Sequence, residues 1–205
     1  MPDLPIEESN RMTPDLNDVA AYEKELAELT IGPVQSLNAP IEFADYDPSW
    51  PTSYEREADR IRSILNDRVV RIEHVGSTSV PSLLAKPIID IVLEVPDSAN
   101  EDAYVPDMEA AGYVLRIREA DWFEHRLFKG PDTNINLHTF SAGCAEVDRM
   151  VMFRDWLRTN AADRELYART KQELAARDWR FVQQYADAKT AVVTEIMARA
   201  AAATG

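Results

Sequence analysis

The sequence is poor in cysteine and has no long apolar run. Cys144 is the single cysteine among 205 residues, so no internal disulfide can form and a reducing compartment is expected. Because it follows Gly143, we interpret it as a small packing residue rather than a nucleophile. No apolar stretch approaches the roughly 20 residues of a membrane span, and the opening MPDLPIEESNR lacks the pattern of a signal peptide. These absences predict a cytoplasmic protein with no membrane contact.

Positive charge is also scarce. The chain has 22 Lys and Arg against 36 Asp and Glu, a net charge of −14. Proteins that bind the phosphate backbone of nucleic acids carry a basic stripe, so we expect no nucleic-acid partner. A local basic site remains compatible with this charge. The 45% hydrophobic content is ordinary for a globular protein with one sizeable core.

Residues 1–40 are predicted to form an N-terminal extension with one helix, and residues 41–205 the main domain. The first dozen residues are expected to be disordered because they are acidic and rich in proline. Apolar residues at helical spacing, with Thr13-Pro14 as the start signal, predict a helix from about Pro14 to Thr30. We expect this helix to pack on the main domain. The alternative is a partner contact through residues 14–30.

The main domain reads as strands and helices followed by a helical tail. Apolar patterns predict strands at 41–46, 69–75, 88–95, 113–117, 123–128 and 135–140. Helical spacing predicts helices at 49–65 and 101–111, and two or three more between 145 and 203. The expected fold is therefore one α/β (α+β) domain, with a mixed sheet flanked by helices and a C-terminal helical subregion.

The rest of the chain is organised around the stretch from Arg71 to Val95, RIEHVGSTSVPSLLAKPIIDIVLEV. It predicts a strand, a tight Gly-Ser turn, a connector and a second, nearly continuous apolar strand. Asp90 lies inside that second strand. A carboxylate in a strand of this kind is costly unless another group pairs with it.

Several motifs carry a family resemblance. The segments EHVGSTSVP, AKPIIDI, HRLFKGP, NLH, FRDWLR and LYARTKQELA resemble the GrpB family, over roughly Ile41 to Ala203. This family is grouped with the nucleotidyltransferase superfamily, and related domains occur fused to dephospho-CoA kinase. The resemblance implies a nucleotidyltransferase-like fold and a divalent metal, with a nucleoside triphosphate as a candidate ligand. Ser82 departs from the pattern, since the family usually has Gly there, and the allowed backbone is narrower for Ser.

A polymerase-β-type nucleotidyltransferase site needs a phosphate-binding turn and a set of acids for two metal ions. Gly76 and Ser77 supply the turn, and Thr78 adds a hydroxyl. Asp90 supplies the first acid, but Val92 stands at the position of the second. Glu94 lies roughly 13 Å further along the strand, too far to replace it. We interpret Glu94 as a solvent-exposed charge.

All three histidines lie in strands predicted to surround Asp90. We predict that Asp90 and His138 are catalytic, and that Asp90, His138 and His74 bind a divalent metal, either Mg, Mn or Zn. His125 and Asn136 are further candidates. Each histidine alone is more often a structural hydrogen-bonding residue than a ligand.

Basic residues near the same strands predict phosphate binding. We expect Lys86 and Arg126 to neutralise phosphate charge, with Lys129 close by. The alternative for Arg126 is an ion pair with Asp90. Arg154, in the predicted helix after the last strand, is a further candidate for the site or for capping it.

These features predict a protein that binds a nucleotide or phosphorylated small molecule, with metal-dependent transfer left open by the incomplete acid set. The first alternative is a non-catalytic nucleotide-binding, ligand-binding or regulatory module. The second is an interaction protein that uses the N-terminal helix. The sequence does not name a substrate.

Overall fold

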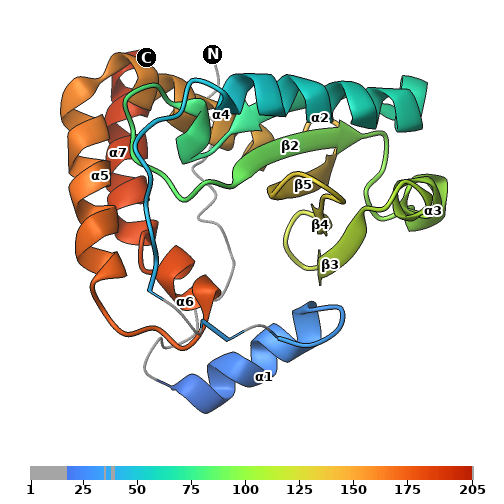
Figure 1. The fold of residues 1–205 in the computed structure, drawn as a ribbon, viewed down its shortest axis with the longest axis horizontal. Coiled ribbons are helices and arrows are strands. Elements are labelled where there is room, and N and C mark those ends of the chain that lie inside the picture. The colour runs from blue at the N-terminus through green and yellow to red at the C-terminus, as the bar shows by residue number, and fades with distance from the viewer. Residues whose placement is uncertain (1–17, 35, 38–39, 205) are drawn as a thin grey trace.

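The computed structural model describes residues 18–34, 36–37 and 40–204. Its centre is a five-stranded sheet in the order β1-β2-β5-β4-β3 (Figure 1). The strands are β1 Arg71–Val75, β2 Ile89–Val95, β3 Val114–Glu119, β4 His125–Lys129 and β5 Ile135–Ser141. β2 and β5 pair in parallel, and the other neighbours pair antiparallel. The predicted mixed sheet is therefore confirmed.

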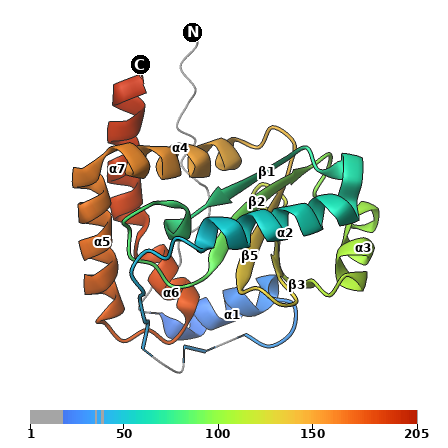
Figure 2. The same cartoon turned by 45° about the horizontal axis from the view of Figure 1, so that its top comes forward.

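The pairing register separates the side chains of the sheet into two faces. On one face, Ile91 and Leu137 join a core with α2 (Trp50–Leu65) and α3 (Val105–Ala110). On the other face, Val92 and Phe140 pack with residues of α4 (Ala145–Thr159). Figure 2 shows α2 and α4 on opposite sides of the strands. Neighbouring strands present paired residues to the same side, so the register decides which polar side chains can meet.

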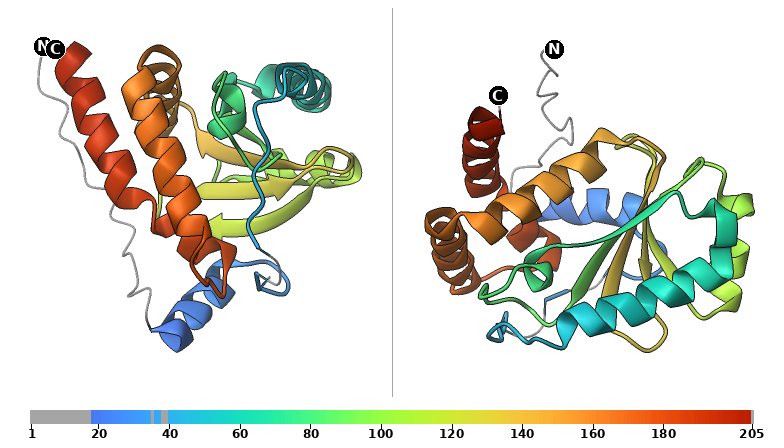
Figure 3. Two further views of the ribbon diagram at one scale, coloured as in Figure 1. Left: turned by 60° about the vertical axis from the view of Figure 1, so that its left-hand side comes forward. Right: turned by 90° about the horizontal axis from the view of Figure 1, so that it is seen from above.

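The C-terminal helices form a second packed region beside α4. They are α5 Ala161–Ala175, α6 Val182–Asp187 and α7 Thr190–Thr204. Apolar residues of α4, α5 and α7 pack against the connector between β1 and β2, with Leu83 fully buried among them. Figure 3 shows α5 and α7 side by side, away from α2. The sequence predicts two or three helices between residues 145 and 203, whereas the structure has four, α4–α7, because the short helix α6 precedes α7.

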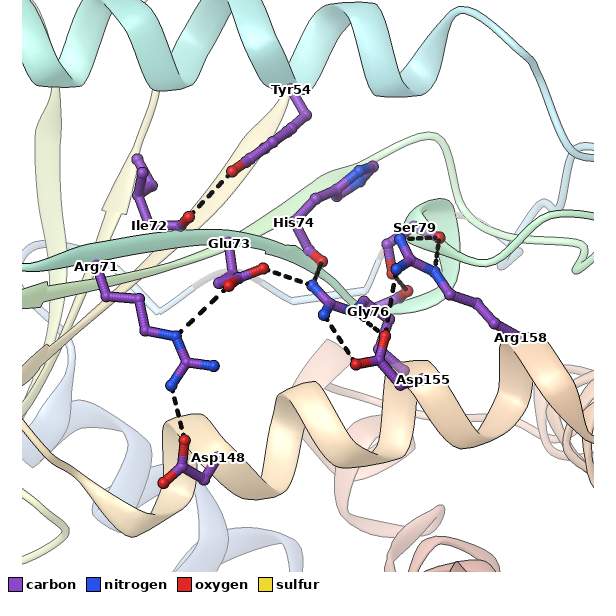
Figure 4. A network of polar contacts seen from close by, with 11 residues as sticks. Tyr54, Arg71, Ile72, Glu73, His74, Gly76, Ser79, Asp148, Asp155 and Arg158 are labelled. Atoms are coloured by element: carbon purple, nitrogen blue, oxygen red, sulfur yellow. Dashed lines mark hydrogen bonds and ion pairs between the residues drawn. The ribbon is translucent and has the colours of Figure 1, made fainter.

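Ion pairs attach α4 to β1 and to the turn after it (Figure 4). Arg71 binds Asp148 at 2.7 Å, and Arg158 donates to the carbonyl of Ser79 at 2.9 and 3.0 Å. Arg154 donates to Glu73 at 2.8 Å and to the His74 carbonyl at 2.9 Å. These contacts fix the Gly76–Ser79 turn against the helical region.

The helix α1, Val19–Leu29, connects the sheet edge to the C-terminal helices. Tyr22 is buried, and its ring stacks on Phe181 at 6.3 Å between centroids. Just past the helix, Thr30 bridges to Ile117 of β3. The expectation that this helix packs on the main domain is confirmed for the described residues. Its predicted start at residues 13–17 lies outside them, as do the first dozen residues, and Asp18 is the N-cap observed.

One predicted strand is wrong. Residues 41–46 make only an isolated bridge, Ala44 to Ala85, instead of joining the sheet. Their alternating pattern reflects a segment that packs along the β1–β2 connector. The predicted helix at 101–111 begins as a 3-10 turn, Glu101–Ala103, before α3. None of the helices in the described residues is long and apolar enough to cross a membrane.

Ser82, the departure from the family pattern, has a φ of 65°. This is the left-handed region, which costs an L-residue roughly 1–2 kcal/mol. A glycine adopts it freely, so the Gly expected at this position has a backbone reason. The connector keeps this conformation with Ser in place.

We therefore predict that Ser82→Gly stabilises the protein. Part of the relieved strain is offset by the greater freedom of Gly in the unfolded chain, so we expect a net gain of about 1 kcal/mol or less. For a chain of this length the melting temperature should rise by roughly 1–4 °C. Ser82→Ala is the matched control, since it removes the hydroxyl and keeps the Cβ. An equal rise in both variants would show that the backbone is not the cause.

Candidate functional site

The candidate site begins where Asp90 meets the turn after β1. Gly76 has a φ of 68°, and a Cβ built on it would lie 2.3 Å from Asp90 Oδ2 and 2.8 Å from Asp90 Cβ. A larger residue would push the carboxylate away, so glycine is required for this approach. In the structure, the turn Gly76-Ser77 therefore lies beside Asp90, as the sequence predicts.

Asn136 and Lys129 extend the site across the sheet. Asn136 lies opposite Asp90 in the parallel pair of β2 and β5. Its Nδ2 donates to Asp90 Oδ1 at 2.7 Å, and its Oδ1 accepts from Lys129 Nζ. These contacts form a chain from ammonium to amide to carboxylate. On the strand beside Asp90, the chain thus presents an amide, and not a further acid.

Two lysines from the C-terminal helical region lie near Asp90 and Ser77. Lys171 of α5 is buried, and its Nζ donates to Ser77 Oγ at 3.0 Å and to the Leu84 carbonyl at 2.5 Å. Lys189, in the turn between α6 and α7, lies with its Nζ 4.8 Å from the centre of the Tyr185 ring. Lys86 contacts the same ring at 5.4 Å. We call Lys86, Lys129, Lys171 and Lys189 the lysine cluster.

Burial sets the protonation of these groups. It raises the pKa of Asp90, although the hydrogen bond from Asn136 and the charges of Lys189, Lys129 and Lys86 oppose that rise. Burial lowers the pKa of each cluster lysine. For Lys171, burial and the charge of Lys189 together lower the pKa to about 7, while the charge of Asp90 opposes the change. Tyr167 hydrogen-bonds Ser77, and burial raises its pKa to about 12. Such shifts are characteristic of functional sites.

His138 and His125 lie on the same face as Asp90 but form a separate chain. His125 Nδ1 is 2.7 Å from Glu119 Oε2, and His125 Nε2 is 3.1 Å from His138 Nδ1. With both rings neutral, His125 donates to the carboxylate and accepts from His138. His138 pairs with Val92, so it is roughly 7 Å further along the sheet than Asp90. A metal shared with Asp90 would have to use His138 Nε2, since His138 Nδ1 contacts His125.

His74 faces the other side of the sheet, so the expected convergence of His74, Asp90 and His138 is wrong. It pairs with Ile91, and its ring stacks on Tyr54 of α2 at 4.9 Å. Thr78 donates to the Ile88 carbonyl, so its oxygen accepts from His74 Nε2–H at 3.0 Å. Burial lowers the pKa of His74 to about 4, which keeps the ring neutral. Both His74 and Thr78 have structural contacts here.

Arg126 also lies on the α2 side, because it pairs with Thr139. It donates to Glu101 at 2.5 Å and to Glu124 at 3.2 Å. The expectation that it joins Lys86 around phosphate is therefore not met, and neither is the alternative ion pair with Asp90. Arg154 binds Glu73 and the β1 backbone, so it holds α4 in place outside the site.

Glu94 is not a solvent-exposed charge. It is buried, and its Oε1 accepts from the backbone N–H groups of Gly143 at 2.8 Å and Cys144 at 3.2 Å. These groups lie at the start of α4, where a carboxylate is favoured by the helix dipole. Cys144 is half-buried, in keeping with a packing role, and burial raises its pKa.

The donor set does not fit the divalent metal that the fold family implies. Mg²⁺ and Mn²⁺ prefer several oxygen ligands, and Zn²⁺ needs three or four N, S or O ligands. Asp90 Oδ1 and Asn136 Oδ1 already accept hydrogen bonds, and ammonium groups surround them. Among the residues that the structure describes, no three His, Cys, Asp or Glu side chains gather to hold a metal.

Sequence reasoning missed Lys171 and Lys189. Both lie in the C-terminal helical region, more than 80 residues after Asp90, and helical spacing alone does not place them at the site. One signal was present. The chain has only five lysines among its 22 basic residues, and four of them form the lysine cluster. The fifth, Lys24, is exposed on α1.

The mixed five-stranded sheet, with helices on its two faces and a Gly-Ser turn beside an acid-bearing strand, defines an α+β protein. The sequence model of the family described as GrpB protein matches residues 40–199. The chain belongs to the GrpB family.

Known proteins agree with this membership. A UPF0157 protein of Halalkalibacterium halodurans is 58% identical over 196 residues, covering 96% of this chain and 97% of that protein. The crystal structure of a conserved protein GrpB from Enterococcus faecalis matches with a TM-score of 0.66 and 31% identity, over 78% of this chain and 96% of that one. A dephospho-CoA kinase of Mycobacterium bovis is 28% identical, over 76% of this chain but 44% of its own length.

The lowered pKa of Lys171 predicts a pH-dependent stability. Between pH 7 and the ordinary lysine pKa near 10.5, the folded state binds fewer protons at Lys171 than the unfolded state does. The free energy of unfolding should therefore rise with pH in this window, by up to about 1.4 kcal/mol per pH unit from this group. Urea unfolding at pH 7, 8 and 9 measures the slope. We expect Lys171→Met to reduce it and Lys24→Met to leave it unchanged. Parallel curves for wild type and Lys171→Met would contradict the assignment.

Proposed function

We propose that this protein binds a nucleotide or a phosphorylated small molecule at the lysine cluster. The observation that carries the proposal is the convergence of four of the five lysines around Asp90 and Ser77 in a chain with a net charge of −14. Buried cations repel one another and lose hydration, so an acidic protein gains no stability from gathering them. An anionic ligand supplies the missing charge.

The groups around Asp90 suit phosphate oxygens. Ammonium groups are point-charge phosphate ligands, and the hydroxyl of Ser77 adds a polar group at the Gly76 turn. Arginine supplies 17 of the 22 basic residues of this chain, yet the cluster consists of lysines. Lysine carries its charge on a flexible stem, so four of them can adjust to one compact anion.

Transfer of a nucleotidyl group is the finer candidate, with Asp90 and His138 in catalytic roles. A non-catalytic regulatory module is the second candidate. It is favoured by the dephospho-CoA kinase of Mycobacterium bovis, in which the matching region is less than half of the chain. It is also favoured by the donor set at Asp90, which does not fit a divalent metal.

We predict that phosphate compounds bind and that Lys189→Met weakens them by about tenfold or more. A charge-assisted hydrogen bond contributes roughly 1.5–3 kcal/mol, which corresponds to this loss. Isothermal titration calorimetry with nucleoside mono-, di- and triphosphates and with sugar phosphates, in buffer with Mg²⁺, measures the affinities. Lys24→Met is the matched control and should bind as the wild type does. The proposal is overturned if no compound binds, or if Lys189→Met binds as tightly as the wild type.

A second prediction separates transfer from plain binding. If the wild type releases pyrophosphate from a nucleoside triphosphate with any divalent metal, we expect Asp90→Asn to lower that rate by about 100-fold or more while binding persists. Asparagine keeps the shape of Asp90 and removes its charge. A rate that survives Asp90→Asn would contradict the catalytic role of Asp90. Binding without release in the wild type would support the regulatory candidate.

A further inference from the structure

We propose that the lysine cluster takes the place of a metal ion, so that the site binds the diphosphate or longer phosphate chain of its ligand without a divalent cation. This inference rests on the proposed function and specifies the ligand of the same site. It follows from three observations: how the acceptor oxygens are occupied, how the ammonium groups are distributed, and how the charges add.

The first observation concerns the oxygens that a cation would need. Asp90 Oδ1 accepts from Asn136, and Asn136 Oδ1 accepts from Lys129. The Oδ2 of Asp90 lies against Gly76. Lys129 therefore holds a positive charge at the amide oxygen, where a cation bridging β2 and β5 would otherwise be coordinated. A divalent ion at this point would meet the ammonium group at close range.

The second observation is that the ammonium groups surround Asp90 from different elements. Lys129 comes from β4 and interacts with Asp90 and Lys86. Lys171 comes from α5, contacts Ser77 and interacts with Lys189 and Asp90. One phosphate group accepts hydrogen bonds only within about 3 Å of its oxygens. Two or more linked phosphates present oxygens over a longer span than one does, so a phosphate chain suits ammonium groups that come from different elements.

The third observation is the balance of charge. Four ammonium groups lie near Asp90, and Asp187 adds a second carboxylate beside Lys189. With the four lysines protonated and both carboxylates ionised, the site carries an excess of about two positive charges. A phosphate monoester carries close to two negative charges at neutral pH, and each further phosphate adds about one. The excess charge of the cluster equals that of one divalent cation, so the cluster can supply to a phosphate chain the positive charge that a metal ion would otherwise bring.

The experiment compares the same titrations with and without divalent cations. Pyrophosphate, ADP and ATP are titrated into the full chain, once in 5 mM EDTA and once in excess Mg²⁺, at about physiological salt. Inorganic phosphate and AMP serve as single-phosphate probes. We expect pyrophosphate and the nucleotides with two or three phosphates to bind at least tenfold more tightly than phosphate and AMP. Their affinity in EDTA should equal or exceed that in Mg²⁺, because Mg²⁺ competes for the phosphate oxygens.

Lys129→Met provides the second test. If the ammonium group neutralises the phosphate chain, this variant should lose about tenfold or more in affinity in EDTA and in Mg²⁺ alike, while Lys24→Met should lose none. Circular dichroism checks that both variants are folded. Binding that requires Mg²⁺, or equal binding of AMP and ATP, overturns this inference and leaves the proposed function standing. Absence of binding by every probe in both buffers overturns the proposed function itself.

Discussion

The carboxylate of Asp90 determines the arrangement around it. It lies in a strand whose other residues, apart from Glu94, are apolar, and it approaches Gly76 so closely that no side chain fits there. An isolated carboxylate in this position would be costly, so it needs positive partners. The partners come from β4, from the β1–β2 connector and from the C-terminal helices. The helical region and the sheet are thereby coupled through one charge, in addition to their apolar contacts.

Much of the fold could be predicted because its signals are local. The apolar run from Ile88 to Val95, the Gly76-Ser77 turn and the alternation in β5 each specify an element within a few residues. The segment at 41–46 shows the limit of this reasoning. Alternation indicates that one side is buried, but it does not say whether the partner is a strand of the sheet or a connector.

The site was predicted only in part, because its assembly depends on register and on distant helices. Asp90, Asn136 and Lys86 follow from neighbouring motifs. The face of His74 depends on the register between β1 and β2: it pairs with Ile91, whereas Val75 pairs with Asp90. One step of register moves a side chain across the sheet, and the local sequence does not specify that step. Lys171 and Lys189 depend on how three helices pack on α4, which no local pattern specifies. Composition is more informative here than local patterns. Only five of the 22 basic residues are lysines, so the presence of four of them at one site is a signal of function.

The lysine cluster also explains why the incomplete acid set does not by itself indicate a lost function. A site with two acids and a metal and a site with one acid and several ammonium groups both present positive charge to a phosphate chain. The two kinds of site differ in which charges repel one another when no ligand is bound. An empty metal site holds mutually repelling carboxylates, whereas this site holds mutually repelling ammonium groups, one of which has a pKa of about 7. Lysines that can release a proton reduce this repulsion, and arginines, which remain charged, could not do so. The choice of lysine over the more abundant arginine is thus consistent with a site that must be stable both empty and occupied by an anion.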